Sequence, residues 1–192
     1  MKPYQTIPIQ ECHEPLVPIP LDQFAMVTPH PYETLGAPYG DRSPYWLRQS
    51  VLQALSAAQV TLQAQHPGWR IQIFDAYRPV AVQQFMVEYT AHTLAQQQGK
   101  LLDTLSKSDR QALMAKVYEF WAPPSSDPQT PPPHSTGAAV DITLVDAAGN
   151  PVDMGSPIDE VSPRSHPDYF KTAVDQTHQT IHHHRRLLRQ VM

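Results

Sequence analysis

The segment at residues 122–133 restricts the fold of this chain more than any other, because six of its twelve residues are proline. Proline fixes φ and has no backbone N–H, so the segment cannot be helical and does not suit the middle of a sheet. The whole chain has 21 prolines in 192 residues, about twice the usual ~5%. The prolines follow no repeat, so we expect irregular connections between elements. The segment at 122–133 is one of these connections, and its prolines make it a stiff lead into His134.

His134 and Asp141 lie seven residues apart, with Gly137 between them and an apolar strand around Asp141. In a uniform strand an odd spacing would place the two side chains on opposite faces. Gly137 permits a break that lets them converge. A carboxylate on an apolar strand is costly to bury without a partner, and a divalent metal ion is a partner that would also use His134. A hydrogen-bonded His–Asp pair in a turn is the alternative.

Hydrophobic spacing and end signals predict a mixture of helices and short strands. The predicted elements are a helix from Ser43-Pro44 to His66, a strand at 69–75, a helix that starts at Pro79, a helix from about Ser108, a strand at 140–144 that turns at Gly149-Asn150 and returns through Val152, and a final helix from about Asp168. We therefore expect an α+β fold, in which a small antiparallel sheet carries the metal site and helices pack around it.

Four blocks of this sequence resemble the D-alanyl-D-alanine dipeptidases, the VanX-type zinc peptidases. Residues 132–141 are similar to the family's zinc-binding pattern Ser-x-His-x-x-Gly-x-x-x-Asp, although Pro132 stands in place of the Ser. Residues 75–79, Asp-Ala-Tyr-Arg-Pro, resemble its Tyr-Arg-Pro segment. Residues 153–159 and 162–166 resemble its Asp-Met-Gly and Ser-His block. The blocks occur in the family's order and cover most of the chain from about Tyr32.

The resemblance implies a role for five residues. His134 and Asp141 would bind one zinc ion, and Arg78 would be catalytic, stabilising the oxyanion that develops in the transition state. Asp159 and His166 would bind substrate. For Arg78, a purely structural pairing with Asp75 at the helix start is the alternative. For Asp159 and His166 the alternatives are plain loop structure or, for His166, service as a third zinc ligand.

The family pattern also includes a Glu-x-x-His segment that supplies the third zinc ligand and the catalytic base. This chain reaches Met192 without one, so we expect a single domain over residues 1–192 that is truncated at its C-terminus. Such a chain would bind zinc weakly and have little or no activity.

The function implied by the resemblance is that of a zinc metallopeptidase that hydrolyses the dipeptide D-Ala-D-Ala to D-alanine. Two alternatives stay open. One is a DD- or LD-carboxypeptidase that acts on cell-wall peptides, and the other is a non-catalytic binding protein of the same fold. The expected partner is thus a small D,D-dipeptide, and a homodimer is left open.

Composition restricts the partners further. The net charge of −4 gives no reason to expect binding to nucleic acid. No stretch approaches the ~20 apolar residues of a membrane span, and the first residues lack the apolar run of a signal peptide. Cys12 is the one cysteine, which fits a reducing compartment. We therefore predict a cytoplasmic protein without membrane contact.

Overall fold

The structure, a computed structural model, describes residues 6–7 and 9–192. Its elements in chain order are β1 (Leu16–Pro18), β2 (Ala25–Met26), α1 (Pro31–Thr34), β3 (Trp46–Arg48), α2 (Gln49–Gln65), β4 (Arg70–Asp75), α3 (Val80–Gln97), the 3₁₀ helix η2 (Leu102–Thr104), α4 (Lys107–Phe120), the 3₁₀ helix η3 (Pro133–Thr136), β5 (Asp141–Val145), the 3₁₀ helix η4 (Pro163–Ser165) and α5 (Gln176–Val191). The expected α+β class is confirmed. Within the described ranges no helix is both long and apolar enough to cross a membrane.

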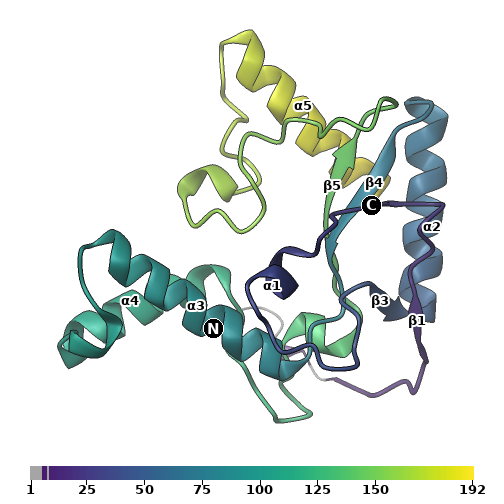
Figure 1. Ribbon diagram of the computed structural model, residues 1–192. Coiled ribbons are helices and arrows are strands. Elements are labelled where there is room, and N and C mark those ends of the chain that lie inside the picture. Colours follow the sequence, from purple (N-terminus) through teal and green to yellow (C-terminus); the bar gives the residue numbers. More distant parts are fainter. Residues whose placement is uncertain (1–5, 8) are drawn as a thin grey trace.

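The main sheet has the order β2-β4-β5. Strands β4 and β5 pair antiparallel, as expected, with Ile71 opposite Leu144, while the two-residue β2 joins β4 in parallel. A separate antiparallel pair is formed by β1 and β3. In Figure 1, α2 runs beside the main sheet, the end of α5 lies behind it, and the α3–α4 hairpin extends away from it at the lower left.

One face of the main sheet packs on helices. Alternate residues of β4 are buried, as predicted for a strand with one covered face. The apolar side chains in this core come from β4, β5, α2 and α5 and include Ile71, Ile73, Leu144, Leu55, Leu62, Leu187 and Val191. A fully buried Leu or Ile contributes about 1.5–3 kcal/mol, so this core fixes β4 and β5, whose ends carry the acidic residues discussed below.

A second core holds the α3–α4 hairpin against the N-terminal part of the chain. Val82 and Met86 of α3 and Val117 of α4 are buried there. Tyr32 and Tyr39, from α1 and the loop after it, pack on the same cluster. This arrangement brings two buried phenol groups close to the start of α3.

Two predicted helix starts are wrong. The chain from Trp46 to Arg48 is strand β3 rather than helix, because Leu47 pairs with Val17 of β1 and is fully buried. Tertiary pairing thus overrides the local helix-start signal. The last helix begins at Gln176 rather than near 168. The Asp175 side chain accepts the N–H of His178 and so caps the start of this helix.

Gly137 makes the break that the sequence predicts between His134 and β5. Its φ is +74°, in the left-handed region, and it follows η3. A Cβ atom there would lie 2.3 Å from Cδ2 of Leu16. The Gly137 carbonyl also accepts the N–H of Arg48 at 2.8 Å. Both the conformation and the close approach to β1 and β3 therefore require glycine.

We expect Gly137→Ala to lower the free energy of unfolding by about 2–4 kcal/mol, since left-handed strain adds to overpacking against Leu16. Gly149 is the matched control, because its φ is +85° but no atom of the described residues lies within 4 Å of the added Cβ. Gly149→Ala should cost only about 1–2 kcal/mol, from strain alone. Urea denaturation of both variants measures the difference, and equal losses would show that the contact with Leu16 is unimportant.

Candidate active site

Three segments meet at one end of the main sheet. Strand β4 ends at Asp75, and the short loop that follows leads through Arg78 into α3. The 3₁₀ helix η3 is bound to this loop, because the N–H of Arg78 donates to the His134 carbonyl at 3.2 Å and the Ser135 hydroxyl donates to the Arg78 carbonyl at 2.7 Å. Strand β5 starts beside it with Asp141.

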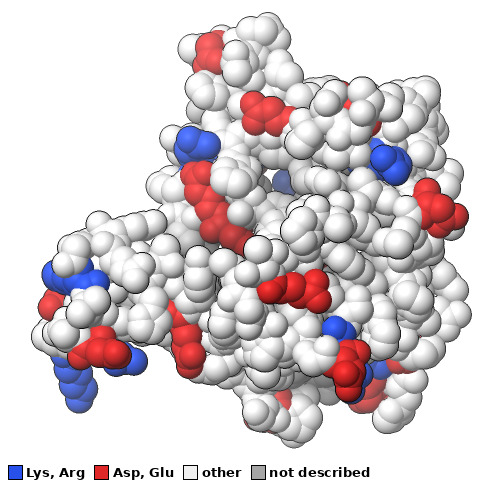
Figure 2. Space-filling view, viewed as in Figure 1, with Lys and Arg blue, Asp and Glu red and all other residues white. Residues whose placement is uncertain are grey.

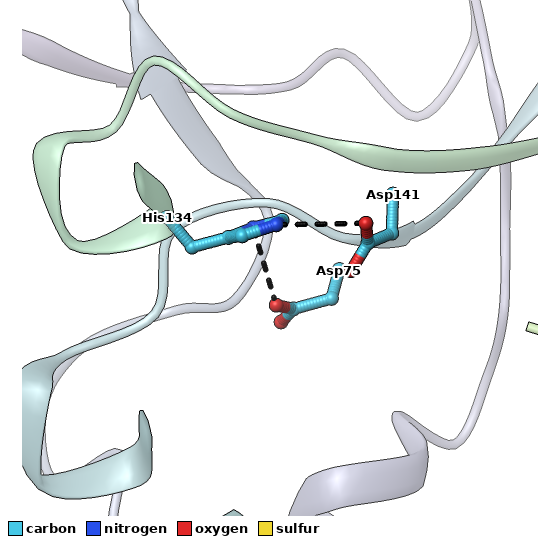
Figure 3. Close-up of side chains that lie close together, drawn as sticks. All are labelled: Asp75, His134 and Asp141. Carbon is cyan, nitrogen blue, oxygen red and sulfur yellow. Dashed lines mark ion pairs between the residues drawn. The ribbon is translucent and has the colours of Figure 1, made fainter. Parts of the chain in front are cut away.

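His134 and Asp141 face one another, as the sequence predicts. His134 Nδ1 lies 2.8 Å from the Ala76 carbonyl, and since a carbonyl can only accept, Nδ1 carries the proton. Nε2 is then the free nitrogen of the neutral ring, and it lies 3.5 Å from Asp141 Oδ1 (Figure 3). Two ligands of a tetrahedral zinc ion are separated by about 3.4 Å. A backbone acceptor on the other nitrogen is also usual for a metal-binding histidine. This pair therefore fits a metal ion.

Asp75 is the third potential ligand that lies close to this pair, but its position argues against direct binding. Its Oδ2 approaches His134 from the Nδ1 side, at 3.6 Å, so it lies away from the free Nε2 (Figure 3). It is also fully buried, and both of its oxygens already have partners. We assign Asp75 to the support of His134 and Arg78 rather than to the metal.

Arg78 is held at the centre of the site by a set of polar contacts. Its Nε donates to Asp75 Oδ2 at 2.8 Å, and its Nη1 donates to Gln83 Oε1 at 2.9 Å. Nη2 reaches Asp141 Oδ2 at 3.1 Å. The guanidinium also lies 5.0 Å from the ring centre of Tyr32 and 5.1 Å from that of Trp121, a cation–π arrangement. The pairing with Asp75 exists and includes Nη2, which lies 2.7 Å from Asp75 Oδ2, and the same nitrogen also faces the His134–Asp141 pair.

The charges of the site influence one another. Burial alone would lower the pKa of His134, but the hydrogen bond and charge of Asp141 outweigh burial, and the pKa is raised. Burial would raise the pKa of Asp141, but His134 and Arg78 outweigh it, and the pKa is lowered. Since a metal needs the unprotonated imidazole nitrogen, metal binding should weaken as the pH falls.

Asp159 is connected to this centre through one tyrosine. The Tyr32 hydroxyl donates to Asp159 Oδ2 at 2.5 Å and accepts from Arg78 Nη2 at 3.4 Å. Asp159 as a whole residue is exposed to solvent. Desolvation of its carboxyl group nevertheless raises the pKa of Asp159 to about 6, and the charges of Asp141 and Asp75 also raise this pKa. The sequence-predicted substrate residue thus lies one contact from Arg78.

His166 lies farther from the centre. Its side chain is 58% exposed, and its Nε2 is 3.9 Å from Glu119 Oε1 of α4. The group of facing metal-ligand atoms found among the described residues does not include it. His166 and Asp159 do line the same groove, of about 1830 Å³, with Phe74 and Thr143. Figure 2 shows a hollow between the part of the molecule that carries α5 and the α3–α4 hairpin, with acidic side chains along it.

Several supporting residues escaped the sequence analysis. Tyr32, His30 and Tyr39 come from the N-terminal region, which carries no motif of its own. Tyr39 donates to Asp75 Oδ1 at 2.8 Å, and His30 Nε2 lies 3.1 Å from the same oxygen, a close contact rather than a well-aligned hydrogen bond. The one available signal was a cluster of His and Tyr residues between 30 and 45, which would suit a buried polar network as well as a surface loop.

Comparison with known proteins shows the family of this chain. The M15 peptidase family model, described as D-ala-D-ala dipeptidase, matches residues 25–192. The chain belongs to this family. A D-alanyl-D-alanine dipeptidase of Synechocystis sp. (strain ATCC 27184 / PCC 6803 / Kazusa) is 51% identical over 172 residues, which cover 90% of this chain and 70% of that protein. As a member of the dipeptidase family, the protein is a metallopeptidase.

If His134 and Asp141 hold the ion, His134→Ala should remove most of the zinc that the unchanged protein binds at the same free zinc concentration, because one of the two identified ligands is lost. His166→Ala is the control, since this exposed histidine is outside the group of facing ligand atoms. Metal analysis of the three proteins gives the answer. Full zinc content in His134→Ala would refute the assignment, and loss of zinc in His166→Ala would make His166 a ligand.

Proposed function

We propose that this protein hydrolyses the dipeptide D-Ala-D-Ala to two molecules of D-alanine, with one zinc ion for which His134 and Asp141 supply two of the three protein ligands of a catalytic site. The observation that carries the proposal is the position of Arg78. Its Nη2 lies 3.1 Å from one oxygen of Asp141, while His134 Nε2 faces the other oxygen at 3.5 Å. A permanent positive charge and a metal-binding pair are thus directed at the same point.

The family match and the Synechocystis dipeptidase support the choice of substrate. A bound zinc ion would polarise the peptide carbonyl and lower the pKa of a water molecule. Residues of this chain must hold the dipeptide, orient its carbonyl and stabilise the charge that appears during the reaction.

Arg78 suits the stabilisation of that charge. Burial would lower the pKa of its guanidinium, but Asp75, Tyr32 and Asp141 outweigh burial, so the pKa is raised and the group stays protonated. Its side chain is only 4% exposed, which strengthens its interaction with a developing oxyanion. Because Asp75 and Gln83 fix the guanidinium beforehand, little reorganisation is needed during the reaction.

Asp159 suits the recognition of the free amino end of the dipeptide. A carboxylate that lines the groove can bind an ammonium group by a charge-assisted hydrogen bond. The hydroxyl of Tyr32 occupies one of its oxygens and leaves the other for substrate. His166 lines the same groove and would contact the substrate from the side of α4.

We expect Arg78→Lys to lower kcat by about 10²–10³-fold with a much smaller change in KM, as for the loss of an oxyanion donor. Lys keeps the positive charge beside Asp75, whereas Ala would leave a buried carboxylate unpaired and endanger folding. Steady-state kinetics with D-Ala-D-Ala tests this, with the exposed Arg42→Lys as the control. An unchanged kcat would return Arg78 to a structural role.

The role of Asp159 predicts a pH dependence of KM. The pKa of Asp159 is raised to about 6, and only the ionised carboxylate binds an ammonium group. KM should therefore be low above this pKa and rise as the pH falls through it. Kinetics between about pH 5 and about pH 8, with zinc content checked at each pH, measure this step. Asp159→Asn should have a high KM without the step, and a step that survives in this variant belongs to another group.

A further inference from the structure

Arg185 of α5 reaches out of its helix and binds the loop that carries Asp159. Its Nε donates to the Met154 carbonyl at 2.7 Å, and its Nη1 donates to the His166 carbonyl at 2.9 Å. Its Nη2 donates to the Arg164 carbonyl at 2.8 Å and to Ser156 Oγ at 3.1 Å. One guanidinium therefore holds both ends of residues 153–166.

Packing contacts around Arg185 hold the same part of the loop. Its guanidinium lies 4.8 Å from the centre of the Phe170 ring, a cation–π distance. Gly155 approaches this ring and Ile181 of α5 so closely that a Cβ there would lie 2.5 Å from Phe170 and 2.7 Å from Ile181. The N-terminal end of the loop is thus packed on α5 by van der Waals contact as well as by hydrogen bonds.

The loop between these fixed ends has little regular structure, although Arg164 also donates to the Gly155 carbonyl from Nε and Nη2. Its regular element is the three-residue η4, Pro163–Ser165. Asp159, in the middle, has a φ of +66°, which is unusual for a residue other than glycine. Among the described residues, the side chain of Asp159 accepts a hydrogen bond from Tyr32 of α1, which lies outside the loop. The position of this carboxylate therefore depends on where the two ends of the loop are anchored.

We propose that Arg185 is a positioning residue that sets the place of Asp159 and thereby the recognition of the substrate's free ammonium group. This inference rests on the proposed dipeptidase function, but it concerns a residue of α5 that has no contact with the His134–Asp141 pair among the described residues. Arg185 acts through the loop and does not touch the substrate.

The chemistry of the side chain explains why arginine is required. A guanidinium presents five N–H donors in a fixed plane, so a single side chain can serve four acceptors at once. Lysine has three donors on a flexible stem and cannot reproduce this planar fork. Three of the four acceptors are backbone carbonyls, so the interaction fixes the path of the chain.

The test compares Arg185→Lys with the unchanged protein and with Arg110→Lys, a substitution of an exposed arginine on α4. Hydrogen exchange read by mass spectrometry reports the order of residues 153–166 without any need for activity. Kinetics are measured with D-Ala-D-Ala and with its N-acetylated form, which lacks the ammonium group. Asp159→Asn and the double variant complete the set.

Arg185→Lys should speed exchange in residues 153–166 several-fold and raise KM for D-Ala-D-Ala about tenfold, with kcat changed less than about twofold. The N-acetylated dipeptide should be equally poor for all variants. In the Asp159→Asn background, Arg185→Lys should have no further effect on KM, because both act on one contact.

Unchanged exchange in Arg185→Lys would overturn the inference, as would an equal effect of this substitution on KM with and without Asp159. Failure of the proposed function has a different signature. In that case the unchanged protein, with zinc supplied, neither binds nor hydrolyses D-Ala-D-Ala, while the exchange comparison still decides whether Arg185 orders the loop.

Discussion

The buried ion pair between Asp75 and Arg78 is the interaction on which the site depends. Both side chains are almost inaccessible, and an isolated buried charge is strongly unfavourable. The structure compensates with hydrogen bonds from Tyr39 to one oxygen of Asp75 and from Arg78 to the other, and with a close contact of His30. Breaking such a pair by removing one partner costs about 3–5 kcal/mol. The pair therefore ties the N-terminal region, the end of β4 and the start of α3 into one unit.

The same unit orients His134 and Asp141, the pair for which we propose metal binding. The Ala76 carbonyl, one residue after Asp75, fixes which nitrogen of His134 is protonated. Arg78 then holds one oxygen of Asp141 and leaves the other to face His134. The orientation of His134 and Asp141 thus comes from neighbouring residues, and many proteins tune a metal site in this way. These contacts also explain why we assign a supporting role to Asp75, although its carboxylate lies close to the His134–Asp141 pair.

The sequence predicts those parts of the structure that depend on local patterns. Strand β4, helix α3 and the break at Gly137 follow from alternation, helical spacing and the needs of a left-handed turn. The start of α2 does not, because a long-range strand pair captures Leu47. For the site, the motif blocks predicted roles for His134, Asp141 and Arg78, and the structure places these side chains together. The contacts of His30 and Tyr39 with Asp75 span 36 residues or more, and no local pattern encodes them.

The two sides of the site differ in how they are held, and the difference has a physical origin. Asp141 begins β5 and Arg78 comes just before α3, and both of these elements bury apolar surface in the two cores. His134 lies in η3, which is hydrogen-bonded to the loop that carries Arg78, so the positions of all three follow from core packing. Asp159 lies in a loop, where ordering the backbone costs about 1–2 kcal/mol per residue and little apolar burial offsets it. Polar contacts from a rigid helix then have to replace core packing. This arrangement suits a metallopeptidase that must admit and release a small substrate. A loop that is anchored at both ends can place a side chain accurately without being part of the core.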